Sequence, residues 1–235
     1  MKKSLKTGTT NEQNRYEWVK KILVEIPSGQ RILDAGAGQL KYRDLCQHLN
    51  YVSQDFAKYD GNGNGSALQT KNWKQNNLDI ISDITSIPEP DASFDAVMCI
   101  EVLEHLPDPV DALREMIRLL KTGGLLILTA PFSSLTHYAP FFYQTGYSRY
   151  FYEYWLSKLG LEVIEMDWNG NYFEYLAQEL RRLPSIGKRY SSLHPNWFQK
   201  QAIRIILYFL DRLSRSDTGS NELLCYGLHI KSRKK

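Results

Sequence analysis

The 235-residue sequence has few cysteines and no long apolar run. Cys46, Cys99 and Cys225 are far apart and show neither metal-ligand spacing nor a disulfide framework, so we expect reduced, buried thiols and no metal site. No run of about 18 apolar residues is present, which predicts no membrane span. The polar N-terminus also lacks the apolar core of a signal peptide. These absences predict a soluble, cytoplasmic protein.

The sequence also lacks a strong excess of either charge. Its formal net charge is +3, and seven of its 29 basic residues lie in the terminal stretches 1–6 and 231–235, which hold no acidic residue. The remaining 22 basic and 26 acidic residues leave the middle of the chain slightly acidic. We therefore expect no broad nucleic-acid-binding face, and we expect the basic ends to be solvated tails.

A glycine loop organises the rest of the chain. The apolar strand predicted at residues 31–33 runs into the small-residue turn 34–38, whose Gly36 and Gly38 allow a tight turn and the close approach of a ligand. Residues 39–49 read as a helix, whose N-terminus would point at that ligand. Such a unit is typical of the cofactor-binding end of an open α/β sheet.

The third glycine of a dinucleotide fingerprint is missing, because Lys41 stands in its place. Asp34, at the end of the strand, would repel a phosphate but suits a ligand that carries an ammonium group. The motif D-A-G-A-G resembles the first motif of the class I S-adenosylmethionine-dependent methyltransferases. A glycine turn in an unrelated α/β protein is the alternative.

Acidic residues follow two more predicted strands. Strand 51–56 places Asp55 about twenty residues beyond Asp34, where a carboxylate can accept hydrogen bonds from both ribose hydroxyls of an adenosyl group; capping of the next loop is the alternative. Strand 78–82 leads into Asp83-Ile84, which resembles the adenine-binding pair of the family. The resemblance implies that Asp83 accepts from the exocyclic amine and that Ile84 packs on the purine, with a cap as the alternative for Asp83.

The string F-D-A-V-M-C-I-E at 94–101 predicts a strand buried on both faces. Together with the following V-L-E-H-L it resembles the fourth motif of the type 11 methyltransferases, a subfamily that includes quinone-biosynthesis enzymes. His105 is a candidate general base, with a structural role as the alternative. The resemblance implies these cofactor-binding residues: Asp34, Ala35, Gly36, Gly38, Asp55, Phe56, Asp83, Ile84, Ile100 and Glu101.

The next segment continues the resemblance. Asp108 and Pro109 predict the N-cap and first position of a helix, which Gly123-Gly124 would end. Residues 125–130 then read as a strand. The string L-L-K-T-G-G-L-L-I-L-T-A-P-F is similar to the strand-five region of the family, so the resemblance runs continuously from residue 31 to residue 132.

Tyrosines mark the expected acceptor site. Eight of the fifteen tyrosines lie between residues 138 and 175, and the stretch 137–149 contains Pro140 and Gly146, as a loop over an active site does. Tyrosine rings suit sugars, aromatic rings or a cationic methyl donor. The acceptor-site candidates are His137, Tyr138, Tyr143, Tyr147 and Arg149. If the acceptor is a hydroxyl, His137 is the first choice of base, ahead of His105.

Helices and two further strands complete the predicted order. We expect helices at 11–26, 151–159, 171–183 and 196–213, and strands at 161–166 and 223–230. Tyr16, in the first helix, either packs in the core or reaches the cofactor. The apolar stripe of 196–213 is wider than one core face needs. It predicts packing or dimerisation, or alternatively contact with a membrane surface, with Lys200, Arg204 and Arg212 at its polar edge.

The sequence thus predicts a single Rossmann-like domain with an open seven-strand sheet, mostly parallel with an antiparallel last strand, and helices on both faces. We divide it into an N-terminal helix (1–29), a cofactor-binding core (30–132), an acceptor loop, sixth strand and helical insertion (133–220), and a last strand with a basic tail (221–235). The resemblance implies methyl transfer from S-adenosylmethionine to an O or N nucleophile of a small molecule.

The acceptor is expected to be a sugar or lipid-linked glycan intermediate, with a quinone-like or other aromatic molecule as the alternative. Residues 133–182 also resemble, more weakly, methyltransferases of bacterial surface-polysaccharide biosynthesis. A non-catalytic S-adenosylmethionine-binding protein and a nicotinamide-dependent oxidoreductase are the alternatives from other classes.

Overall fold

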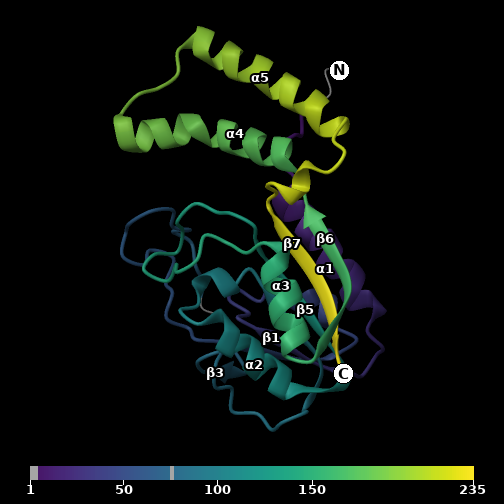
Figure 1. The fold of residues 1–235 in the computed structure, drawn as a ribbon. Coiled ribbons are helices and arrows are strands. Elements are labelled where there is room, and N and C mark those ends of the chain that lie inside the picture. Colours follow the sequence, from purple (N-terminus) through teal and green to yellow (C-terminus); the bar gives the residue numbers. More distant parts are fainter. Residues whose placement is uncertain (1–4, 75–76) are drawn as a thin grey trace. The chain divides into compact units, whose positions relative to one another are not determined.

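The computed structural model describes residues 5–74 and 77–235. The structure contains a seven-stranded sheet of order β3-β2-β1-β4-β5-β7-β6, most of whose strands are labelled in Figure 1. The strands are β1 (Arg31–Ala35), β2 (Asn50–Asp55), β3 (Ile80–Ile81), β4 (Phe94–Ile100), β5 (Leu120–Pro131), β6 (Leu161–Asn169) and β7 (Gly227–Lys234). The strands from β3 to β5 pair in parallel, and β7 pairs antiparallel with β5. The predicted Rossmann-like sheet is confirmed.

Five α-helices and three short 3-10 turns connect the strands in the described part of the chain. They are α1 (Asn11–Glu25), η1 (Arg43–Cys46), η2 (Leu103–His105), α2 (Pro109–Leu119), α3 (Arg149–Lys158), α4 (Tyr172–Ser191), α5 (Trp197–Arg215) and η3 (Ser220–Glu222). The described residues divide into two compact units, one of residues 16–74, 77–167 and 227–235 and the other of residues 5–15 and 168–226.

The core of the first unit explains why its central strands are so apolar. Ile32, Met98 and Ile127, from three neighbouring strands, are fully buried in one cluster with Trp18 and Ile22 of α1. A strand covered on both faces must be apolar where it is buried, as β4 is from Ala96 to Cys99. On α1, Tyr16 packs against this cluster and stacks on Tyr42 with ring centroids 6.1 Å apart, so it has the packing role.

The helix predicted at 39–49 is wrong. This fully described stretch forms only the short turn η1. Leu40, the second residue of the predicted helix, has φ +58, a left-handed conformation that a right-handed helix does not accept. The glycine loop therefore has no helix N-terminus beside it, and its ligand contacts must come from the loop itself.

The predicted start of α2 is confirmed, and its end is corrected. The Asp108 side chain accepts a hydrogen bond from the Asp111 amide at 3.1 Å, and Pro109 takes the first helical position. The helix ends at Leu119, and Gly123-Gly124 lies within β5, where the register with β4 shifts. The two glycines therefore lie at the point where the pairing of β5 with β4 is irregular, and they do not cap a helix.

The predicted solvated tail at 231–235 is also wrong, because most of it belongs to β7. Lys234 Nζ donates to the carbonyls of Ile117 and Leu120, at 2.6 and 2.7 Å, and so binds the C-terminal end of α2. Lys231 pairs with Glu25 at 2.6 Å. Lys2 and Lys3, in the other predicted tail, lie outside the described residues.

Two other expectations are corrected in the helices. The helix predicted at 151–159 is α3, which begins two residues earlier, at Arg149, and buries Tyr152 and Leu156. The helix predicted to stop at Leu183 runs on through Pro184 to Ser191 as α4.

The second unit is built on the helical hairpin of α4 and α5. Asn196 begins α5 with a capping box that it forms with Gln199. Ala177, Leu207 and Leu210 form the small buried core of the hairpin. Gly8 lies against α4 so closely that a Cβ there would approach the Ala177 backbone carbonyl carbon to 2.5 Å. Among the described residues, no helix is long and apolar enough to cross a bilayer.

Candidate active site

The glycine loop leaves β1 in a conformation that only small residues tolerate. Gly36 has φ +81, and a Cβ there would lie 2.5 Å from a Val102 methyl carbon. The Gly36 and Ala37 amides donate to the Gln54 carbonyl at 2.9 and 2.8 Å, which ties the loop to the end of β2. The loop is therefore held in place before any ligand arrives.

Gln54 was not predicted as a site residue, yet it links three strand ends. Its side-chain amide donates to the Ser82 carbonyl at 2.8 Å, after β3, and its oxygen accepts from the Gly36 amide at 3.3 Å. The side chain is 1% exposed. Its position directly before Asp55 at the end of a strand was the available signal.

The strand ends surround a cavity of about 470 Å³. This volume lies within the usual range of small-molecule sites. Of the predicted cofactor residues, the cavity wall includes Gly36, Gly38, Asp55, Phe56, Asp83, Ile84 and Glu101. The structure thus brings together seven residues from four separate parts of the sequence.

The two strand-end acids are held by backbone amides. Asp55 accepts from the Gly38 amide at 3.0 Å and from the Ala57 amide at 2.8 Å. Asp83 accepts from the amide and hydroxyl of Thr85, at 2.9 and 2.8 Å, and these hydrogen bonds lower the pKa of Asp83. Both side chains are therefore fixed in orientation, and Asp83 is ionised at neutral pH.

Three of the predicted cofactor residues do not line the cavity: Asp34, Ala35 and Ile100. Asp34 is only 2% exposed, and it accepts a hydrogen bond from the Tyr51 hydroxyl at 2.6 Å. Burial raises the pKa of Asp34 to about 7. This carboxyl is buried and does not belong to the cavity wall, and its contact with a ligand ammonium group stays a prediction.

The segment after β2 covers the glycine loop. A Cβ on Gly38 would come within 3.1 Å of the Trp73 ring, so this ring lies on the glycine. Trp73 makes an edge contact with Tyr59, at 5.1 Å between centroids, and Tyr59 packs on Tyr138 at 4.6 Å. Tyr59 and Trp73 both line the cavity. No periodicity in the sequence had pointed to them.

The predicted acceptor loop divides between the cavity and the core. Tyr138 and Tyr143 line the cavity. Tyr147 is buried, and its hydroxyl donates to the Leu103 carbonyl at 2.8 Å. Arg149 begins α3, where it lies over the Tyr150 ring and near Glu153. Tyr147 and Arg149 are therefore not brought to the cavity, and their contacts are structural.

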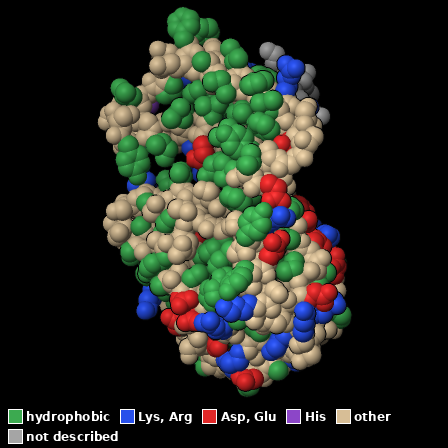
Figure 2. Space-filling model, viewed as in Figure 1, with side chains coloured by type: hydrophobic (Ala, Val, Ile, Leu, Met, Phe, Trp, Pro, Cys, Tyr) green, Lys and Arg blue, Asp and Glu red, His purple; other side chains and the backbone are tan. Residues whose placement is uncertain are grey.

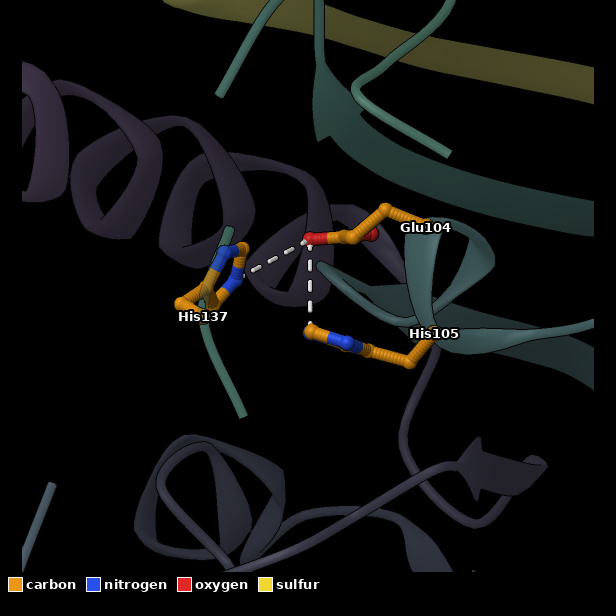
Figure 3. Close-up of side chains that lie close together, drawn as sticks. All are labelled: Glu104, His105 and His137. Carbon is orange, nitrogen blue, oxygen red and sulfur yellow. Dashed lines mark ion pairs between the residues drawn. The ribbon is translucent and has the colours of Figure 1, made fainter. Parts of the chain in front are cut away.

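The two candidate bases lie side by side, and only His105 lines the cavity. The rings of His105 and His137 are 4.7 Å apart, and their Nε2 atoms lie 3.7 and 4.0 Å from Glu104 Oε1 (Figure 3). Burial and the neighbouring His137 lower the pKa of His105 to about 4. An imidazole with so low a pKa is a weak general base near neutral pH.

Part of the chain is similar to known methyltransferases. Residues 33–128 match the model of a methyltransferase domain. The chain is 34% identical over 115 residues to a ubiquinone biosynthesis O-methyltransferase of Xanthomonas oryzae pv. oryzae, covering 43% of each protein. It is 33% identical over 161 residues to a demethylmenaquinone methyltransferase of Renibacterium salmoninarum, covering 66% of this chain and 61% of the relative. The chain thus spans less than two thirds of the length of either relative.

The whole fold also has a solved counterpart. A SAM-dependent methyltransferase from Archaeoglobus fulgidus aligns with a TM-score of 0.56 at 18% identity, covering 97% of this chain and 96% of that one. Residues 33–128 match a methyltransferase domain, and the chain has the class I methyltransferase fold. The matched residues 33–128 include the glycine loop, and the shared fold agrees with the family that the sequence resembles.

Proposed function

We propose that the cavity binds S-adenosylmethionine and that the protein transfers its methyl group to a small molecule. The single observation that carries this proposal is the convergence of Gly36, Gly38, Asp55 and Asp83 on one cavity wall. The adenine would lie by Asp83 and Ile84, and the ribose would bind Asp55. The methionyl end would then extend toward Glu101.

Methyl transfer needs little chemistry from the protein, because the sulfonium already activates the methyl group. The main contribution is to hold the acceptor in line with the methyl group and to exclude water. Phe141, Tyr138 and Tyr143 border the cavity on the side of His105. Aromatic faces attract the positive sulfonium and pack on a flat acceptor, so this wall is the proposed acceptor side.

We propose the hydroxyl group of an aromatic, quinone-like molecule as the acceptor. The aromatic wall supports a flat substrate, and the two curated relatives are named for quinone methylation. The sequence analysis put the sugar or glycan first and the aromatic molecule second, and this proposal reverses that order. Among the described residues of the cavity wall, none favours the sugar or lipid-linked glycan in particular, so that class stays a prediction.

We further propose that the α4–α5 hairpin contacts an anionic lipid surface. Trp197 and Phe198 are 64% and 76% exposed at the start of α5, and Ile205 and Phe209 are also largely exposed. Figure 2 shows hydrophobic side chains gathered over this hairpin. Residues 180–210 hold six Arg or Lys and no Asp or Glu. Exposed apolar side chains flanked by basic ones suit the interface of an anionic bilayer.

Calorimetric titration tests the cofactor and its site together. S-Adenosylmethionine and S-adenosylhomocysteine should bind the protein, and NAD should not. Asp55→Ala should weaken binding at least tenfold, whereas Asp44→Ala, at an exposed site outside the cavity, should leave it unchanged. No binding by the native protein, or equal binding by the Asp55→Ala variant, would contradict the proposal.

The acceptor and the lipid contact need separate measurements. Transfer of a labelled methyl group to a soluble catechol analogue, and not to a sugar nucleotide, would support the aromatic class; the opposite result would reinstate the sugar. Flotation with phosphatidylglycerol vesicles should carry the protein, and Trp197→Ser with Phe198→Ser should abolish this. A dimer that depends on these two residues and ignores vesicles would identify a second copy as the occupant instead.

A further inference from the structure

Glu104, His105 and His137 converge at the edge of the cavity (Figure 3). Glu104 and His105 come from η2, directly after β4, and His137 comes from the loop after β5. One ligating atom from each lies within 4.8 Å of the others. The cluster contains two imidazoles and one carboxylate from two distant parts of the sequence, and the proposed methyl transfer uses it only as a source of candidate bases.

Backbone hydrogen bonds fix the orientation of both imidazoles. His105 Nδ1 lies 2.6 Å from the Phe141 carbonyl, and His137 Nδ1 lies 2.9 Å from the Leu135 carbonyl. A carbonyl oxygen only accepts, so each Nδ1 carries the hydrogen. In the neutral rings, Nε2 then carries the lone pair. Metal-ligating histidines are commonly held in this way, with one ring nitrogen on a carbonyl and the other facing the metal.

Both lone pairs face the same carboxylate. His105 Nε2 lies 3.7 Å from Glu104 Oε1, and His137 Nε2 lies 4.0 Å from it. His105 Nε2 is buried and has no hydrogen-bond partner among the described residues. A lone pair of this kind, aimed at a carboxylate oxygen beyond hydrogen-bond distance, leaves a position between them that suits a cation.

The burial of Glu104 favours a cation beside its carboxylate. The Glu104 side chain has no exposed surface, while those of His105 and His137 are 14% and 24% exposed. A carboxylate charge away from water is costly unless positive charge lies close to it. A divalent ion bound by all three side chains would supply that charge.

We propose that Glu104, His105 and His137 form a binding site for a divalent transition-metal ion of the zinc type. Two imidazoles and one carboxylate are a ligand set of catalytic zinc sites, which keep the fourth position open. Bonds of about 2.0–2.2 Å at tetrahedral angles place ligand atoms roughly 3.4 Å apart. The two observed distances must therefore contract by less than 1 Å. Imidazole ligands favour such an ion over Mg²⁺.

The open position would face the cavity, because His105 belongs to its wall. The role of the ion there rests on the proposed methyl transfer. An acceptor hydroxyl that binds the ion loses its proton to solvent more readily. The resulting oxyanion attacks the methyl carbon, and the electron pair of the broken carbon–sulfur bond stays on sulfur.

Cobalt(II) tests the site without any need for activity, because its visible absorption becomes intense in a tetrahedral site. The full-length, metal-stripped protein should bind one equivalent of Co²⁺ with a tetrahedral spectrum, and Zn²⁺ should displace it. Glu104→Gln and His137→Ala should each weaken binding at least tenfold. The control is His194→Ala, whose side chain is exposed and outside the cluster.

The outcomes are separable from those for the cofactor. Absence of a Co²⁺ spectrum in the native protein, or equal Co²⁺ binding by the Glu104→Gln and His137→Ala variants, would overturn the metal site. The cluster would then be a pair of histidines around a buried acid. Thermal melts of each variant distinguish lost ligands from lost folding, and Glu104→Gln keeps the shape of the side chain. Calorimetry with S-adenosylhomocysteine separately reports whether the cofactor site is intact.

Discussion

Asp34→Asn should have a higher free energy of unfolding than the native chain, and this advantage should be larger at pH 8 than at pH 5. Asp34 is 2% exposed, and burial raises its pKa from 3.8 to about 7. Between these two pKa values, the folded protein therefore holds a proton on Asp34 that the unfolded chain has released. A carboxyl with a raised pKa stabilises the fold fully only below its unfolded pKa, and this contribution is lost as the pH rises toward the folded pKa.

The size of the effect follows from the two pKa values. Each unit of difference is worth about 1.4 kcal/mol. With a pKa of 3.8 in the unfolded chain and about 7 in the folded protein, ionisation of Asp34 lowers the free energy of unfolding by about 1.7 kcal/mol at pH 5 and about 4.3 kcal/mol at pH 8. The asparagine variant has no such loss. Its stability advantage over the native chain should therefore grow by about 2.6 kcal/mol from pH 5 to pH 8.

Urea unfolding of both proteins at several pH values measures this advantage, and the other titrating groups cancel in the difference. Tyr51→Phe provides a second variant, because the Tyr51 hydroxyl donates to Asp34 and holds the pKa of Asp34 down. Its loss should deepen the destabilisation at pH 8. An Asp34→Asn advantage that stays constant across this range would refute the reasoning, since the native carboxyl would then titrate as it does in the unfolded chain.

Three further substitutions test the packing around the site. Gly36→Ala should abolish binding of S-adenosylhomocysteine in calorimetry and lower the free energy of unfolding by about 1–3 kcal/mol, since the new Cβ would lie 2.5 Å from Val102; unchanged binding would contradict the tight loop. Lys234→Met should cost about 1–3 kcal/mol in urea unfolding, because it removes two hydrogen bonds to the end of α2; no loss would mean that water replaces the amine. Trp73→Ala should weaken binding of S-adenosylhomocysteine severalfold, because the ring covers Gly38, and equal affinity would show that Trp73 does not cover the bound ligand.

The sequence predicted the strands of the sheet better than its connections. A buried strand such as β4 can be predicted from its run of apolar residues. The start of α2 can be predicted from Asp108-Pro109, a local N-cap signal. The helix at 39–49 failed because its apolar spacing was helical while Leu40 adopts a positive φ. That conformation of a leucine is imposed by the surrounding fold and leaves no mark in the sequence.

The site residues that could be predicted are those that stand directly at the end of a predicted strand. Asp55 and Asp83 line the cavity because the ends of parallel strands meet at one edge of the sheet. Trp73 and Tyr59 were missed because their loop meets the cavity only through long-range packing. His105 and His137 were each expected as a base, but their shared approach to Glu104 depends on two loops that meet only in the folded chain.

The place of β7 has a consequence for how the chain folds. It lies between β5 and β6 in the sheet, yet residues 170–226 separate it from β6 in the sequence. Closing a loop of that length costs roughly 3–4 kcal/mol of chain entropy before the strand gains any pairing. Until β7 inserts, β5 and β6 both present open edges that can pair with other chains. Aggregation during refolding should therefore depend on the sequence of β7 more than on any other strand.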